Sequence, residues 1–217
     1  MQHQVKPFAE MRGLLVSNQK SSFRWTIWPW WVLLTAIGGG VGFLLGLSVA
    51  ESMSRVFGRP IFEAVLYGIL GASIAVLQWL VLRAYVTQAS QWVLASTVGW
   101  ILVGALADVL EIKGGLVAVW PALIGATVGT FQWLVLQKHV PLAGFWIVAS
   151  AIGWVAGWYA GSAMDEVVTM FVYSERLGLA ILFAVLAAVV GAFTGLVLIW
   201  LLRHSNLKKS ALGKSAA

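Results

Sequence analysis

The sequence has no cysteine and little charge. None of its 217 residues is cysteine, and 10% are aspartate, glutamate, lysine or arginine, whereas a soluble domain carries about 25%. The missing cysteine excludes disulfides, thiolate metal sites and cysteine nucleophiles. The low charge excludes an ordinary soluble fold. Because disorder requires low hydrophobicity, the apolar fraction of 60% excludes a disordered chain.

Signatures of catalysis are missing as well. The three histidines, His3, His139 and His204, all lie outside the long apolar segments, so neither buried haem ligation nor a Ser–His hydrolase is expected. No phosphate-binding loop or zinc-protease motif is present. No charged residue lies at the centre of an apolar segment, where ion pathways carry them. We predict no enzyme, no catalytic residue, no metal and no cofactor.

Long apolar segments are what the sequence does have. A helix needs about 20 apolar residues to cross about 30 Å of hydrocarbon. Six segments qualify, at about 26–50, 62–82, 90–110, 115–137, 143–164 and 177–202. We expect an all-α polytopic membrane protein whose six transmembrane helices occupy 26–203, between a polar tail at 1–25 and a basic tail at 204–217. The first segment is expected to be a retained helix, because it is too long for a signal peptide core.

The distribution of lysine and arginine predicts the orientation. One side, with both tails and the second and fourth loops, has ten basic residues and one acid; the other has four basic residues and seven acids. Basic loops favour the cytoplasm, so both termini are expected there. The net charge of +6 is then explained by basic loops and tails that face anionic lipid. The expected partners are the lipid bilayer and other membrane proteins, and not nucleic acid.

An internal repeat is the strongest pattern. Trp92-Val-Leu-Ala-Ser96-Thr-Val-Gly99-Trp100 matches Trp146-Ile-Val-Ala-Ser150-Ala-Ile-Gly153-Trp154, and the segment from Trp31 to Gly38 is a weaker copy. Gln78-Trp79-Leu-Val-Leu82-Arg83 matches Gln132-Trp133-Leu-Val-Leu136, while the sixth segment lacks its glutamine near Leu198. We predict three parallel two-helix hairpins at 26–82, 90–137 and 143–203, arranged as a pseudo-threefold bundle or a row.

Three sets of residues are candidates for a site. Gln78, Gln132, Ser96 and Ser150 would either bond neighbouring helices or line a polar cavity that faces the cytoplasm. Trp100 and Trp154 would either pack in the core or line a groove for a hydrophobic ligand. A third set comprises acids at the outer helix ends, either solvated or forming a polar ring: Glu51, Glu111, Asp165 and Glu166.

An aromatic belt at the cytoplasmic interface is a further expectation, because tryptophan favours that boundary. It would contain Trp25, Trp28, Trp30, Trp31, Trp79, Trp92, Trp133, Trp146 and Trp200.

The strings Gln-Trp-Leu-Val-Leu-Arg and Trp-x-x-Ala-Ser-x-x-Gly-Trp resemble those of a loose group of uncharacterised bacterial multispanning proteins that carry them in tandem. The resemblance covers the second to fifth segments best. It implies a bacterial inner or internal membrane and supplies no activity. The main expectation is a structural, accessory or scaffold subunit. The alternatives are a small-solute transporter or channel, and a binder of a quinone, carotenoid or lipid.

Overall fold

The protein is all-α. A computed structural model describes residues 25–109 and 119–215, with side chains at 25–107 and 119–204. The helices are α2 (Ile27–Phe57), α3 (Phe62–Leu82), α4 (Ser90–Val109), α5 (Trp120–Leu136), α6 (Phe145–Phe171) and α7 (Glu175–Ser215), with a short 3-10 helix, η1 (Arg59–Ile61). The described residues contain no strand, so the predicted fold class is confirmed at this level.

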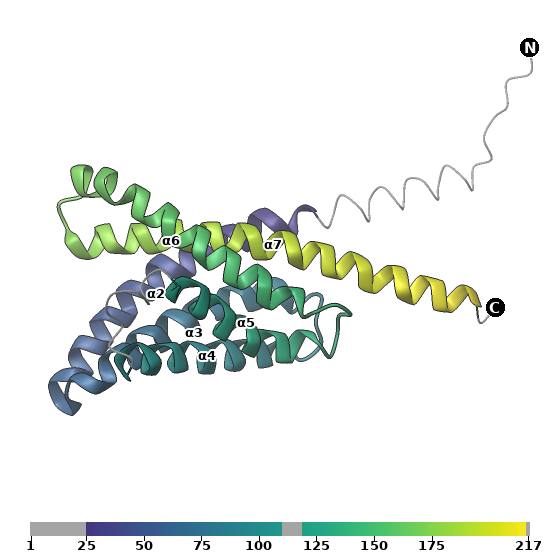
Figure 1. Ribbon diagram of the computed structural model, residues 1–217, viewed down its shortest axis with the longest axis horizontal. Helices are drawn as coiled ribbons and strands as arrows, with labels where there is room; N and C mark the ends of the chain where they lie inside the picture. Colours follow the sequence, from purple (N-terminus) through teal and green to yellow (C-terminus); the bar gives the residue numbers. More distant parts are fainter. Residues whose placement is uncertain (1–24, 110–118, 216–217) are drawn as a thin grey trace, which may run out of the picture.

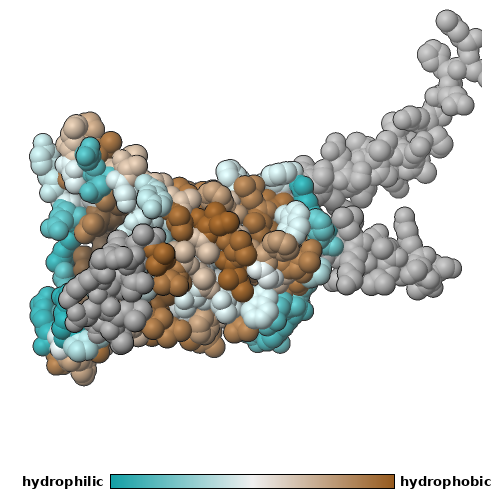
Figure 2. Space-filling view, in the orientation of Figure 1, coloured by the Kyte–Doolittle hydropathy of each residue, from teal (hydrophilic) through white to brown (hydrophobic). Residues whose placement is uncertain are grey.

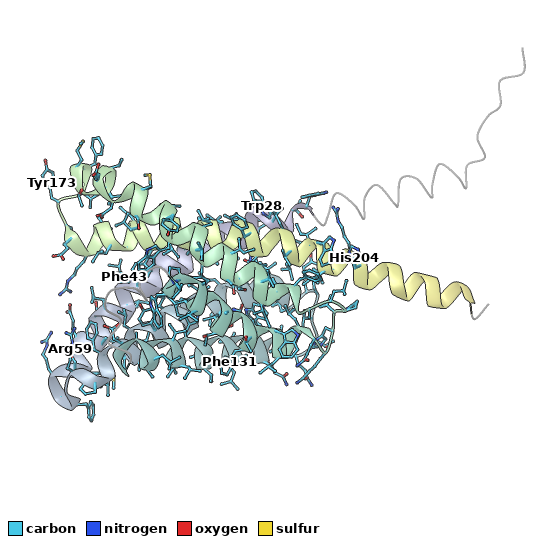
Figure 3. All side chains as sticks on the ribbon, in the orientation of Figure 1. Trp28, Phe43, Arg59, Phe131, Tyr173 and His204 are labelled. Carbon is cyan, nitrogen blue, oxygen red and sulfur yellow. The ribbon has the colours of Figure 1, made fainter. Side chains whose placement is uncertain are left out.

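The six helices form one closed bundle. Each helix packs against the next along the chain, and α7 packs against α2. Trp28 near the start of α2 and His204 on α7 lie toward one end of the bundle, whereas Arg59 and Tyr173 lie toward the other (Figure 3). At that second end, the α2–α3 and α6–α7 connections diverge from each other (Figure 1).

The helices are suited to a membrane. Five of them are long and apolar enough to cross one, and α5, with 17 residues, is a shorter apolar helix. The surface in Figure 2 shows an apolar band between more polar ends. On α2, large apolar side chains are exposed at every fourth position: Leu33, Ile37, Val41, Leu45 and Val49. This distribution is consistent with a helical bundle in lipid.

Small residues occupy the inner face of the same helix. Gly38, Gly42 and Gly46 lie against α3, and a Cβ added at Gly38 would be 2.7 Å from the Ile74 Cα. The backbones of the two helices therefore approach closely, as they do at small-residue interfaces in membranes.

The helix ends differ from the apolar segments. α2 continues to Phe57, seven residues beyond the expected end, and stops where Gly58 takes φ +88°. Hydrophobicity marks where a membrane would end, whereas a helix ends where the backbone turns. In the same way α6 continues to Phe171 and α7 to Ser215. α5 begins at Trp120, with Pro121 in its first turn, where proline is favoured.

Candidate functional site: a buried tryptophan and glutamine network

Three tryptophans meet inside the bundle. Trp31, Trp92 and Trp146, from α2, α4 and α6, are each at most 1% exposed. Their ring centroids are 6.2, 6.1 and 5.4 Å apart, in edge-to-face arrangements that aromatic rings favour. The expectation that these three belong to an interfacial belt is therefore wrong, because they fill the core.

Other tryptophans of that set do lie on the surface. Trp25 and Trp30 are 53% and 59% exposed, and Trp200 is 37% exposed. The guanidinium of Arg203 lies 4.6 Å from the ring centroid of Trp25. An indole beside a basic residue suits a membrane–water interface.

Gln78 on α3 bonds helices on both sides. Its Oε1 accepts from Trp92 Nε1 at 3.1 Å, and its Nε2 donates to Thr35 Oγ1 at 3.1 Å. An indole N–H can only donate, so the amide oxygen must face Trp92 and the orientation of the amide is determined. One N–H of the amide remains beyond these two bonds.

Gln132 on α5 makes the same two kinds of hydrogen bond. Its Oε1 accepts from Trp146 Nε1 at 2.8 Å, and its Nε2 donates to Ser96 Oγ at 3.0 Å. Both glutamines are buried. Each amide thus ties the helix before it to the helix after it.

Thr194 on α7 serves the third tryptophan. Its Oγ1 accepts from Trp31 Nε1 at 3.1 Å and donates to the Val190 carbonyl at 2.8 Å. Threonine has no second polar atom to extend to α6. There Ser150 is 3% exposed, and its Oγ has no hydrogen-bond partner.

The packing identifies the position that corresponds to glutamine on α7. Gly129 on α5 lies against Ser150 and Ile147, whereas Gly191 on α7 lies against Thr35 and Val32. Gln132 follows Gly129 by three residues, as Thr194 follows Gly191. By this packing Thr194 occupies the place on α7 that Gln132 occupies on α5, one helical turn before Leu198, where the sequence comparison placed it.

The network lines a small internal cavity of about 30 Å³. Of the four predicted polar residues, Gln78, Gln132 and Ser150 line it, and Ser96 does not. Its other lining residues are Thr35, Ile74, Trp100, Val128, Trp146, Trp154, Ala187, Val190 and Thr194. The volume is sufficient for one or two water molecules and far below that of ligand pockets, which begin at about 300 Å³.

Trp100 and Trp154 pack against each other. They are 2% and 6% exposed, and their ring centroids are 5.0 Å apart. Trp100 also lies directly over Gly71. Their rings form core packing beside the cavity, and their role as ligand contacts stays a prediction.

A larger hollow of about 370 Å³ lies elsewhere, between the start of α2 and the end of α3. It is lined by Thr26, Ile27, Trp30, Leu34, Leu80, Val81, Ala84 and Tyr85. Neither Trp100 nor Trp154 lines it.

The acidic candidates are separated. Glu51 on α2 pairs with Arg176 on α7, with 2.9 Å between the Oε2 and Nη2 atoms. Asp165 and Glu166 are exposed on α6, and Glu111 lies outside the described residues. Within the described part of the chain, no group of three or more histidine or acidic side chains could hold a metal ion. The predicted outer ring is represented there by a single ion pair.

No family model, curated protein or solved structure matches this chain.

Proposed function

We propose that this chain is a non-catalytic integral membrane protein that serves as a structural, accessory or scaffold subunit. The observation that carries the proposal is that side chains occupy nearly all of the interior of the bundle. Of the buried polar side chains, all except Ser150 form hydrogen bonds with the clustered tryptophans or with one another, and the space left is about 30 Å³. A closely packed core with little free space, beneath an apolar surface, supports a role in assembly.

The proposed architecture is three parallel two-helix hairpins around a pseudo-threefold axis. Two observations support it. Trp31, Trp92 and Trp146 come from alternate helices and contact one another. Each donates its indole N–H to a side chain on an intervening helix. A row of hairpins would not bring α7 against α2.

The proposed location is a bacterial inner or internal membrane, with both termini in the cytoplasm. The charge asymmetry supports this orientation, and Trp28 and His204 lie at one end of the bundle. Phosphatase and fluorescent-protein fusions provide the test. The fluorescent protein should be active at the C-terminus and the phosphatase in the α6–α7 connection; the reverse pattern would overturn the orientation.

The scaffold role predicts a stable assembly. Membranes should be solubilised in a mild detergent and separated on a native gel, with the protein detected by a C-terminal tag. We expect the protein to migrate with a second protein at fixed stoichiometry, including after a wash with high salt. Migration only as a free monomer, at every detergent concentration, would contradict the scaffold proposal.

A small-solute transporter or channel is the second candidate. The observation that favours it is that Gln78, Gln132 and Ser150 line one cavity on the inside of the bundle. Proteoliposomes can separate the two functions by light scattering after an osmotic shock with urea, glycerol or potassium chloride. The scaffold proposal predicts the permeability of protein-free liposomes, whereas faster solute entry would favour a passage.

A further inference from the structure

The inner cavity has unsatisfied hydrogen-bonding groups on more than one side. Gln78 and Gln132 each use one N–H and the amide oxygen in the bonds to threonine, serine and tryptophan. Since a primary amide has two N–H donors, each glutamine keeps one. Ser150 Oγ has no partner at all. All three residues line the same cavity.

The cavity is of the size and polarity of a water site. About 30 Å³ exceeds the 10–15 Å³ that one water requires, and a buried water needs two to four polar partners. No lining residue carries a charge. An ion would have to give up its hydration without a counter-charge, which is costly, so the cavity favours a neutral ligand.

We propose that the cavity is a specific binding site for water, with one water molecule held by Gln78, Gln132 and Ser150. Water can accept two hydrogen bonds and donate two. It would accept from the two amide N–H groups and donate to Ser150 Oγ. Such a water would be bound whether or not the protein is a scaffold.

The position of the site follows from the side chain at residue 194. Ser96 receives its hydrogen bond from Gln132, and Thr35 receives one from Gln78. The corresponding donor for Ser150 would come from α7, where Thr194 is too short to supply it. The water would take the place of the missing amide.

Radiolytic labelling in ¹⁸O water tests this directly in the whole protein, in detergent or nanodiscs, because bound water next to a side chain generates hydroxyl radicals locally. Trp146 and Trp154 line the cavity, whereas Trp31 and Trp92 are buried and do not. We expect Trp146 and Trp154 to be oxidised several-fold faster than the other two. Equal, background labelling of all four would show a dry cavity and overturn the proposal.

Two variants give an independent readout by thermal unfolding. With a bound water, Ser150→Ala removes one of its partners and should lower the Tm. In a dry cavity the same change deletes an unsatisfied hydroxyl and should raise the Tm. Thr194→Gln should supply the amide, displace the water and reduce labelling of Trp154 to that of Trp31. Unchanged labelling in a folded Thr194→Gln protein would contradict the assigned place.

The same unfolding experiment separates water from an anion. A water site predicts an equal Tm in chloride and in gluconate at equal ionic strength. A Tm that rises with chloride in the wild type, but not in Ser150→Ala, would identify an anion site and overturn the proposal.

Discussion

Gln132 and Thr194 both accept a hydrogen bond from a buried tryptophan, but they differ in the other bonds that they can make. Each accepts an indole N–H, from Trp146 and from Trp31 respectively. Only the glutamine also donates to the adjacent helix, at Ser96. Beside Thr194 the serine on the adjacent helix, Ser150, has no partner. An amide, which has both a donor and an acceptor group, links three helices in this apolar interior. A single hydroxyl links two helices and leaves the serine on the third without a hydrogen bond.

The largest loss of stability is expected on substitution of Gln132. Gln132→Leu would remove two bonds and leave both Trp146 Nε1 and Ser96 Oγ buried without a partner. At about 1–3 kcal/mol for each of the two orphaned groups, we expect a loss of about 2–6 kcal/mol in the free energy of unfolding, measured by titration with sodium dodecyl sulfate. Gln137→Leu, at an exposed glutamine at the end of the same helix, is the matched control and should change it little. Equal losses in the two variants would refute the bridging role.

The contacts of α6 with α5 and with α7 also differ in how closely the two backbones approach. A Cβ at Gly125, on α5, would lie within 2.7 Å of the Ala151 Cα, whereas a Cβ at Gly153, facing α7, would be 3.4 Å or more from its neighbours. Gly125→Ala should force the α5 and α6 backbones apart and cost about 1–3 kcal/mol. Gly153→Ala should be close to neutral. Circular dichroism melts of the two variants provide the measurement, and a larger loss at Gly153 would contradict the packing.

Much of the fold could be predicted from the sequence. Segments of about 20 apolar residues can satisfy their backbone in lipid only as helices, and the helices α2 to α7 lie on those segments. Four polar side chains could also be identified, because burying a polar group in an apolar segment is costly unless the group serves a purpose there: Gln78, Gln132, Ser96 and Ser150. The extensions of α2 and α6 beyond the apolar segments could not be predicted, since helices continue into water until a turn such as that at Gly58 ends them.

The tryptophan cluster was not predictable for a physical reason. Apolar residues cover both faces of a membrane helix, so periodicity does not reveal which face is inside. Trp31 and Trp30 are adjacent in sequence, but one is 0% and the other 59% exposed. The usable signal was the hydroxyl four residues after each buried ring, at Thr35, Ser96 and Ser150. Thr194 does not follow a tryptophan by four residues, so this pattern could not identify it.

The two indole acceptors, Gln132 and Thr194, should respond differently when the tryptophan that donates to them is replaced. Trp146→Phe keeps most of the ring contact but leaves Gln132 Oε1 without a donor. Trp31→Phe leaves Thr194 with its bond to the Val190 carbonyl. We expect Trp146→Phe to be the more destabilising by about 1 kcal/mol, the usual net value of one hydrogen bond. Trp30→Phe at the exposed neighbour is the control. The reverse order of Trp146→Phe and Trp31→Phe would show that ring packing, and not the amide, determines stability here.

The smallest effect is expected at the ion pair between α2 and α7. Glu51 and Arg176 form an ion pair whose side chains are 30% and 60% exposed, and exposed pairs contribute about 0.2–1 kcal/mol. Glu51→Gln should therefore lower the Tm slightly, and the difference from wild type should shrink in 1 M salt because the charges are screened. Glu166→Gln, at an exposed acid of α6 outside this pair, should leave the Tm unchanged at both salt concentrations. A loss at Glu51 as large as that at Gln132 would mean that this ion pair contributes as much to stability as the interior network.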